Sequence, residues 1–424
     1  MQRNAVAVFL VFLVFFVISL LTNILNSLIP NIIDDFSLTQ FVASLVTFSF
    51  FIAYGVMSIP AGVLLERYRE KKVLVASFAL AFVGSVTFAT APRFGVMLAS
   101  LFLIGIGMAM LQVAINPLLR VAGGEEHFAF NSAAAQLIFG LASFGSPWLY
   151  SYLVVGLRAE EPANALLAVL SRMVPAELPW VSLYWVFAVI TLVMVLVCGF
   201  VRLPEVVLKE DERAGAVATY RELLRRPTVL LYFAGIFTYV GTEQGVANWI
   251  SQFLETYHGL DPVREGAAAV SLFWGLMTVG CLLGLLLLKL FDSRRVLVGF
   301  AGAAMVTLAF ALFGPATVSR WAFPLMGFCA SVMWPIIFSL ALNSVDRHHG
   351  AFSGILVTGI VGGALLPPVV GGLGDLFGLR TGMMVLFVTL GYILSIGLWA
   401  RPLVSNETTS LRSLLAALLR LKRG

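Results

Sequence analysis

Charged residues are scarce in this sequence. Asp, Glu, Lys and Arg together make up 12% of its 424 residues, whereas 60% are hydrophobic and the mean hydropathy is +0.97. A soluble chain of this length could not hide so much apolar surface, and its polar stretches are too short to form a separate soluble domain. The composition therefore excludes an ordinary soluble protein and indicates a chain that lies within a membrane.

Cysteine is also rare. The three cysteines are Cys198, Cys281 and Cys329, and each lies in an apolar stretch. Their spacing matches neither a disulfide framework nor a set of metal ligands. We interpret them as small hydrophobic side chains within helices, and we expect no metal and no cofactor.

Lys and Arg are missing from the middle of every long apolar stretch. A carrier of phosphate or carboxylates would need a buried cation to pair with its substrate, so this absence argues against both substrate classes. The net charge of +5 is spread over many short loops rather than gathered into one basic patch. We therefore expect no nucleic-acid partner.

Long apolar stretches are what the sequence has in abundance. About 20 such residues in a helix cross the roughly 30 Å core of a bilayer. The stretches cover residues 5–30, 41–65, 73–92, 94–119, 128–155, 181–201, 228–254, 266–291, 296–314, 319–344, 351–374 and 382–400. The first is too long for a signal peptide and has no small-residue cleavage site. We predict an all-α membrane protein with twelve transmembrane helices.

The basic residues predict how the chain is oriented. With the N-terminus inside, 21 of the 27 Lys and Arg residues fall at internal ends of the helices and six fall outside. Lys and Arg resist translocation, so this imbalance favours cytoplasmic positions for both termini. We expect a multi-pass protein of the cell inner (plasma) membrane that acts as a monomer in the lipid bilayer.

Two short motifs recur about half a chain length apart. Lys71-Lys-Val-Leu-Val75 returns as Arg294-Arg-Val-Leu-Val298, 223 residues later. His127-Phe-Ala-Phe130 is echoed by His349-Gly-Ala-Phe352, at an offset of 222. The nearly shared offset favours a duplication, so we predict two pseudo-symmetric halves of six helices each.

The polar stretches divide the chain. We predict an N-terminal half at 1–202, a cytoplasmic linker at 203–227, a C-terminal half at 228–401 and a basic amphipathic tail at 402–424 that lies on the inner leaflet. In the longest external loop, residues 163–173 are expected to form a short surface helix.

Amides and tryptophans gather at mid-membrane depth. Asn and Gln each donate and accept hydrogen bonds, which matches the vicinal hydroxyls of a sugar. An indole offers an apolar face to the C–H side of a pyranose ring. The candidate substrate-binding residues are Asn23, Asn26, Gln112, Asn116, Gln136, Tyr239, Gln244, Asn248, Trp249, Trp274 and Trp334. They predict a transporter, and not an enzyme, for a sugar or a similar polyhydroxylated small molecule.

Glu243 is the only acidic residue far from the end of an apolar stretch. A carboxylate at membrane depth costs several kcal/mol, so it should face a cavity or a partner rather than lipid. We interpret Glu243 as a functional residue. The alternative is a structural hydrogen bond made by its protonated form.

Other functions remain open. Transmembrane amides also join helices by hydrogen bonds, without any ligand. An exporter of amphipathic drugs or metabolites on the same fold is the main alternative, but it would need fewer amides and a more continuous aromatic and aliphatic wall. A membrane sensor would need a signalling domain, and we expect none in the short stretch after Arg401.

Six segments, taken in order, resemble the fucose permease-like sugar symporters of the major facilitator superfamily. They are Asn26-Ser-Leu-Ile-Pro30, Leu111-Gln-Val-Ala-Ile-Asn-Pro117, Tyr239-Val-Gly-Thr-Glu-Gln-Gly-Val-Ala-Asn-Trp249, Ser271-Leu-Phe-Trp-Gly275, Trp334-Pro-Ile-Ile-Phe-Ser-Leu-Ala341 and Gly362-Gly-Ala-Leu-Leu-Pro-Pro368. The resemblance implies parallel six-helix halves, a substrate site midway between them and transport by alternating access.

The loop from Gly62 to Lys72 resembles the signature loop of that superfamily. Glu66 holds the acidic position, and Arg67 and Lys71 supply cations. The resemblance implies a charge clasp between the halves on the cytoplasmic face, which would stabilise the outward-facing state. The alternative is simple anchoring by positive charge at the inner surface.

The departures from the family bear on ion coupling. Its proton-coupled members carry an Asp at the position of Asn26 and a Glu at that of Gln112, whereas here both are amides that cannot exchange protons. The family's Arg in the eighth helix is Cys281, and its Asn in the fifth is Phe139. Glu243 is therefore the remaining candidate for coupling.

Three roles for Glu243 remain open. Because burial disfavours the charged carboxylate, it could bind a proton near neutral pH. With amide carbonyls beside it, it could instead ligate sodium. In a plain uniporter it would only hydrogen-bond a sugar hydroxyl.

Overall fold

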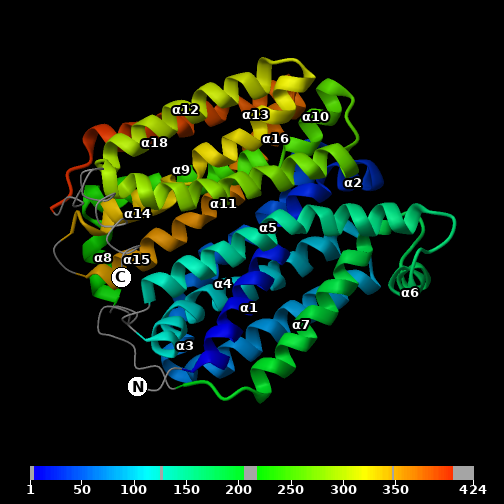
Figure 1. The fold of residues 1–424 in the computed structure, drawn as a ribbon, viewed down its shortest axis with the longest axis horizontal. Coiled ribbons are helices and arrows are strands. Elements are labelled where there is room, and N and C mark those ends of the chain that lie inside the picture. Colours follow the sequence, from blue (N-terminus) through cyan, green and yellow to red (C-terminus); the bar gives the residue numbers. More distant parts are fainter. Residues whose placement is uncertain (1–3, 125–127, 205–216, 346–347, 404–424) are drawn as a thin grey trace, which may run out of the picture.

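The computed structural model describes residues 4–124, 128–204, 217–345 and 348–403, and these are almost entirely helical (Figure 1). Eleven helices within that part of the chain are long and apolar enough to cross a membrane. A further crossing consists of two helices in succession, α9 (Pro227–Ala247) and α10 (Ile250–His258). Glu243 and its polar neighbours lie on this crossing. The prediction of an all-α membrane fold with twelve crossings is confirmed.

The first half starts with α1 (Ala5–Asn23) and α2 (Leu25–Phe36), which together form one crossing. The long α3 (Gln40–Thr90) contains the second and third crossings, separated at Arg69, whose φ of 65° and ψ of 164° are not helical. The remaining elements are α4 (Phe94–Gly123), α5 (Phe128–Arg158), α6 (Ala165–Met173), the 3₁₀ turn η2 (Pro179–Val181) and α7 (Ser182–Phe200). The short helix expected at 163–173 is α6.

The second half follows α8 (Val217–Leu224), a helix within the expected linker. After α9 and α10 come η4 (Pro262–Gly266), α11 (Ala267–Leu290), α12 (Ser293–Phe313), α13 (Ala316–Ala330), α14 (Met333–Leu342), α15 (His349–Thr358), η5 (Gly359–Val361), α16 (Gly362–Phe377), α17 (Leu379–Met383) and α18 (Val385–Trp399). Residues 205–216 of the linker and 404–424 of the expected amphipathic tail lie outside the described residues.

Several crossings are interrupted away from their ends. The interruptions lie at Ile24, Asn248–Trp249, Ser331–Val332 and Gly359–Val361. The first two fall in the first and seventh crossings, which occupy equivalent places in the two halves, and each adjoins an asparagine. Broken helices near the bilayer midplane are where transporters of this architecture form substrate sites.

The halves lie side by side, and α3 packs along α16 while α5 packs along α11 (Figure 1). One end of the bundle carries α8, the turn within α3 and the start of α12; we name it the basic end. The opposite end carries α6 and the α2–α3 and α16–α17 junctions; we name it the α6 end. The first and last described segments are both anchored at the basic end, where Asn4 N donates to Ala122 O (3.1 Å) and Leu403 N to Asn343 O (2.7 Å).

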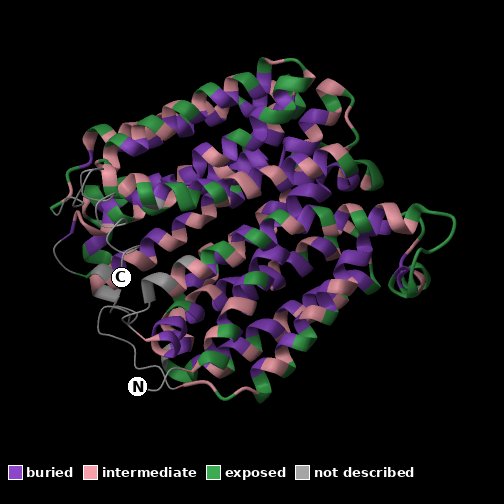
Figure 2. Cartoon of the chain, in the orientation of Figure 1, coloured by how far each residue is buried: buried purple, intermediate pink, exposed green. Residues whose placement is uncertain are grey.

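Buried side chains fill the interior of each half, and exposed side chains follow the outer faces of the helices (Figure 2). Many of those exposed side chains are large and apolar: Phe200, Val388 and Leu398 are 84%, 72% and 70% exposed. Such a surface would be costly in water but suits contact with lipid tails. The protein is therefore a multi-pass membrane protein.

Candidate functional site

Glu243 is held by side chains of its own helix. Tyr239 Oη donates to Glu243 Oε2 at 2.6 Å, and Gln244 Nε2 donates to Oε1 at 3.1 Å. Tyr239 and Glu243 are four residues apart on α9, so their side chains share a face of the helix. Both carboxyl oxygens therefore have a donor, and the orientation of the carboxyl group is fixed.

Aromatic rings of α14 lie beside this network. The ring of Trp334 on α14 lies 6.1 Å from that of Tyr239 and stacks on Phe338 with a centroid separation of 5.9 Å. On α11, the Cys281 thiol donates to Ser331 O at the break in the tenth crossing (3.2 Å). Helix α14 therefore packs against α9 at Tyr239, the residue that donates to Glu243.

Several buried polar atoms of the predicted binding residues lack a hydrogen-bond partner within the described part of the chain. They are Asn26 Nδ2, Gln244 Oε1, Asn248 Nδ2 and Trp274 Nε1, in side chains that are at most 4% exposed. A buried polar group without a partner costs about 1–3 kcal/mol, so native proteins rarely leave one unpaired without a reason. These atoms offer three donors and one acceptor, which is what a hydroxylated ligand requires.

Other predicted binding residues have their polar groups occupied by neighbouring helices. Asn23 Nδ2 donates to Ser143 Oγ on α5 at 2.7 Å. Trp249 Nε1 donates to Pro367 O on α16 at 3.2 Å. In this structure both side chains join helices, which is the role that transmembrane amides and indoles have when no ligand is bound.

The candidates on α4 and α5 are the most open. Gln112 is half-buried, whereas Asn116 and Gln136 are exposed. None of the three hydrogen-bonds to the Glu243 network in the part of the chain that the structure describes. An amide in contact with lipid tails is costly. The assignment of these three side chains to a central cavity stays a prediction.

A carboxylate that our sequence analysis missed joins the halves at the α6 end. Asp375 on α16 accepts from the backbone N–H groups of Gln40 (2.8 Å) and Phe41 (2.9 Å), at the start of α3. Free N–H groups and the helix dipole make a helix N-terminus a favourable place for a negative charge. We name these contacts the Asp375 latch.

The close approach of α16 to the start of α3 at the latch depends on glycine. A Cβ atom at Gly371 would lie 2.8 Å from Gln40 O, so a larger residue would push α3 away. Asp375 stands one residue beyond the apolar stretch 351–374, in the segment Gly371-Gly-Leu-Gly-Asp375. The sequence signal that could have identified Asp375 is an acid placed directly after closely spaced glycines.

Two further hydrogen bonds cross between the halves deeper in the bundle. Thr47 Oγ1 on α3 donates to Asn248 Oδ1, beside the break in the seventh crossing (2.5 Å). Ser271 Oγ on α11 donates to Phe144 O on α5, also at 2.5 Å. Asn248 thus uses its acceptor on the other half while its Nδ2 donor has no partner among the described residues.

The sequence of this chain matches that of a known protein family. The sequence profile of the Major Facilitator Superfamily matches residues 11–360. The chain belongs to this superfamily. Its two six-helix halves, with broken helices at the polar centre, are the arrangement expected of a Major Facilitator Superfamily secondary transporter.

Named relatives of this Major Facilitator Superfamily chain carry sugars. The glucose/galactose transporter of Brucella abortus is 30% identical over 380 residues, which are 88% of each chain. The L-fucose-proton symporter of Escherichia coli is 25% identical over 379 residues, which are 84% of each chain. The solved structure of a bacterial homolog of the human lysosomal transporter Spinster, inward-facing and occupied, shares the fold at 16% identity, with a TM-score of 0.79 over 94% of this chain and 97% of that one.

The residues of the expected superfamily clasp lie at the basic end. Lys71 Nζ donates to Val201 O (3.1 Å), a residue of its own half, and the exposed Arg67 lies over the ring of Tyr68 at 5.3 Å. The side chain of Glu66 lies outside the described part of the structure. The clasp across the halves stays a prediction.

Proposed function

We propose that this protein is a secondary transporter, and not an enzyme, that moves a sugar across the cell inner membrane by alternating access. The observation that carries the proposal is the set of buried polar atoms on Asn26, Gln244, Asn248 and Trp274 that have no partner among the described residues. A sugar would supply the missing partners, and Trp334 would supply an apolar face for its ring. The names of the glucose/galactose and L-fucose relatives point to the same substrate class.

The basic end is assigned to the cytoplasm, because 21 of the 27 Lys and Arg residues fall on that side. The α6 end then faces outward. The Asp375 latch joins the start of α3 to the end of α16 at the α6 end. We therefore assign the structure to a state closed to the outside. The protein acts as a monomer in the bilayer, without a nucleic-acid partner.

Ion coupling is assigned to Glu243. Asn26 and Gln112 carry no titratable group, whereas Glu243 is fixed by Tyr239 and Gln244 beside the proposed sugar site. Uptake of a proton, or binding of sodium by its carboxylate, would change the hydrogen bonds available to a sugar. Binding of the ion and the sugar would then be linked.

The test uses purified protein in liposomes with radiolabelled glucose, galactose and L-fucose. Wild type should accumulate at least one of these sugars under a proton or a sodium gradient. Glu243→Gln should still exchange that sugar across the membrane but should not accumulate it. Glu255→Gln is the matched control, because this carboxyl group lies on the same crossing, outside the Glu243 network, and should leave accumulation unchanged.

The possible failures are distinct. If wild type transports none of the sugars, the proposed substrate class is wrong. If it equilibrates a sugar but never accumulates it under either gradient, the sugar site stands, the coupling role of Glu243 is wrong and the protein is a uniporter.

A further inference from the structure

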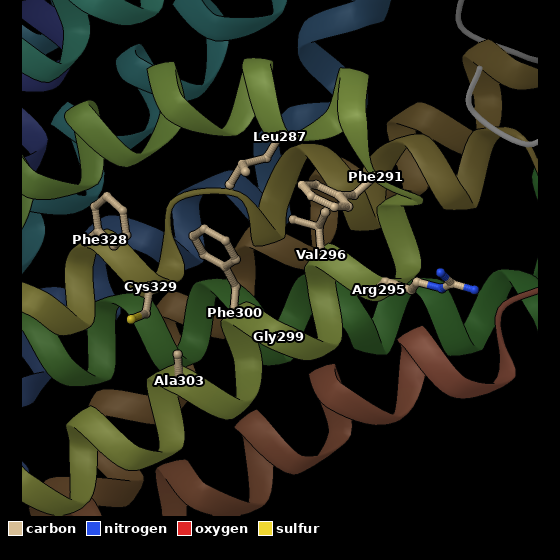
Figure 3. Close-up of a pocket in the computed structure, with 9 residues that line it drawn as sticks. All are labelled: Leu287, Phe291, Arg295, Val296, Gly299, Phe300, Ala303, Phe328 and Cys329. Atoms are coloured by element: carbon tan, nitrogen blue, oxygen red, sulfur yellow. The ribbon is translucent and has the colours of Figure 1, made fainter. Parts of the chain in front are cut away.

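A hollow of about 370 Å³ lies between α11, α12 and α13 (Figure 3), and none of the residues that line it belongs to the proposed sugar site. Its wall is apolar, with Leu287, Phe300 and Phe328 among the side chains that line it. Arg295 is the one charged residue in that wall. No amide lines the hollow, so it is unsuited to a sugar.

Gly299 leaves part of the hollow open. A Cβ atom at Gly299 would meet no other atom within 4 Å, so the missing side chain leaves open space on α12. Beside it, the rings of Phe300 and Phe328 stack at 5.9 Å and form a rigid apolar wall. The shape is therefore built by tightly packed neighbours rather than by loose side chains.

The charge of Arg295 is available to a ligand. Arg295 lies in the first turn of α12 at the basic end and is exposed. The nearby Asp292 is engaged with Arg294 at 3.3 Å. Among the described residues no carboxylate pairs with the guanidinium of Arg295. Guanidinium groups match phosphate oxygens in charge and geometry, so the end of the hollow at Arg295 favours a phosphate group.

The dimensions and direction of the hollow suit a lipid. Arg295 and Ala303, both in its wall, are eight residues apart on α12, which corresponds to about 12 Å along the helix. Half of a bilayer core is about 15 Å thick. The cation therefore sits where lipid headgroups lie, and the apolar wall extends toward the bilayer centre as an acyl chain does.

We propose that this hollow binds an acyl chain of an anionic phospholipid from the leaflet at the basic end, with the lipid phosphate paired to Arg295. Basic pockets between transmembrane helices on the cytoplasmic side are a known physical solution for anionic headgroups. The site is independent of the transported substrate, since it shares no residue with the Glu243 network.

Native mass spectrometry of the purified full-length protein tests the proposal. The protein is titrated with phosphatidylglycerol and, separately, with phosphatidylcholine that has the same acyl chains. Arg295→Gln removes the cation, and Gly299→Leu places a side chain in the hollow at a position where a Cβ atom meets nothing within 4 Å. Each should weaken the tightest phosphatidylglycerol binding about tenfold, as expected for the loss of one charge-assisted contact or of the acyl-chain seat.

Two variants serve as matched controls. Lys289→Gln removes an exposed cation at the same end, outside the wall of the hollow. Gly302→Leu adds the same side chain at another open glycine of α12. Both should bind phosphatidylglycerol as wild type does.

Three results would overturn the proposal. Unchanged phosphatidylglycerol binding in Arg295→Gln and Gly299→Leu would show that the hollow is not the site. Equal losses in the controls would show unspecific lipid adsorption. Equally tight binding of phosphatidylcholine by wild type would show that the site does not select anionic lipid.

Discussion

Asp375 at the α6 end and the amides at the centre of the molecule use their polar groups in opposite ways. At the α6 end, both oxygens of Asp375 accept hydrogen bonds from the other half. In the centre, Asn26, Gln244 and Asn248 each keep a buried polar atom without a partner in the described part of the chain. An unpaired polar group costs more in the interior than near water, so the centre is the more expensive place to leave one. Under the proposed function, the outer contacts hold a conformational state and the central atoms bind the ligand.

The sharpest test of this comparison replaces two asparagines of the first crossing. Asn26→Leu removes a buried donor that has no partner among the residues that the structure describes, so the sugar-free protein should keep its thermal stability. Sugar affinity should fall by about 1–3 kcal/mol, or roughly 5- to 150-fold, because a sugar hydroxyl loses its donor. Equilibrium binding of the transported sugar and thermal unfolding measure the two quantities.

Asn23→Leu is the counterpart and should behave in the opposite way. It removes the hydrogen bond to Ser143 that joins α1 to α5, so the melting temperature should fall while sugar affinity changes little. If the two variants behave alike, the distinction between ligand-binding and helix-joining amides is wrong.

The second test concerns the Asp375 latch. Asp375→Ala removes both acceptors from the start of α3, and it should favour opening at the α6 end by about 1 kcal/mol, because this partly solvated contact is screened by water. Spin labels at the exposed Arg93 and Thr317, on opposite halves, report the separation in a cysteine-free background. The population at longer distances should rise about fivefold.

Asp261→Ala is the control for the latch. Asp261 also caps a helix start at the α6 end, but its oxygen accepts from Val263 N and Arg264 N within its own half. Its loss should leave the distances between the halves unchanged. A latch variant with the wild-type distance distribution would show that Asp375 does not hold the halves together.

The smallest effect is expected at the basic end. If Glu66, Arg67 and Lys71 form the predicted clasp in the outward-facing state, Glu66→Lys should shift the population toward inward-facing by a few tenths of a kcal/mol to about 1 kcal/mol, as for exposed ion pairs. The same spin labels should then show fewer long distances at the α6 end. An unchanged distribution would leave positive-inside anchoring as the role of this loop.

The sequence alone determined the fold and the most informative residue. Twelve apolar stretches can only cross a membrane as helices, because no other open structure pairs its backbone groups in lipid. The cost of burying a charge identified Glu243 as a candidate functional residue. Its spacing of four residues from Tyr239 on a helix is consistent with the hydrogen bond between them. These features depend on local composition and periodicity, which a sequence displays directly.

Tertiary structure alone decided which polar residues are free. Asn23 and Asn26 are three residues apart with the same side chain, yet one donates to Ser143 and the other has a donor without a partner in the described residues. The latch depends on where α3 meets α16, far apart in the chain, and so the sequence analysis did not identify Asp375. The chemistry of a side chain determines which hydrogen bonds it can make. Whether it makes them depends on which helix lies opposite, and the packing of the helices decides which helix that is.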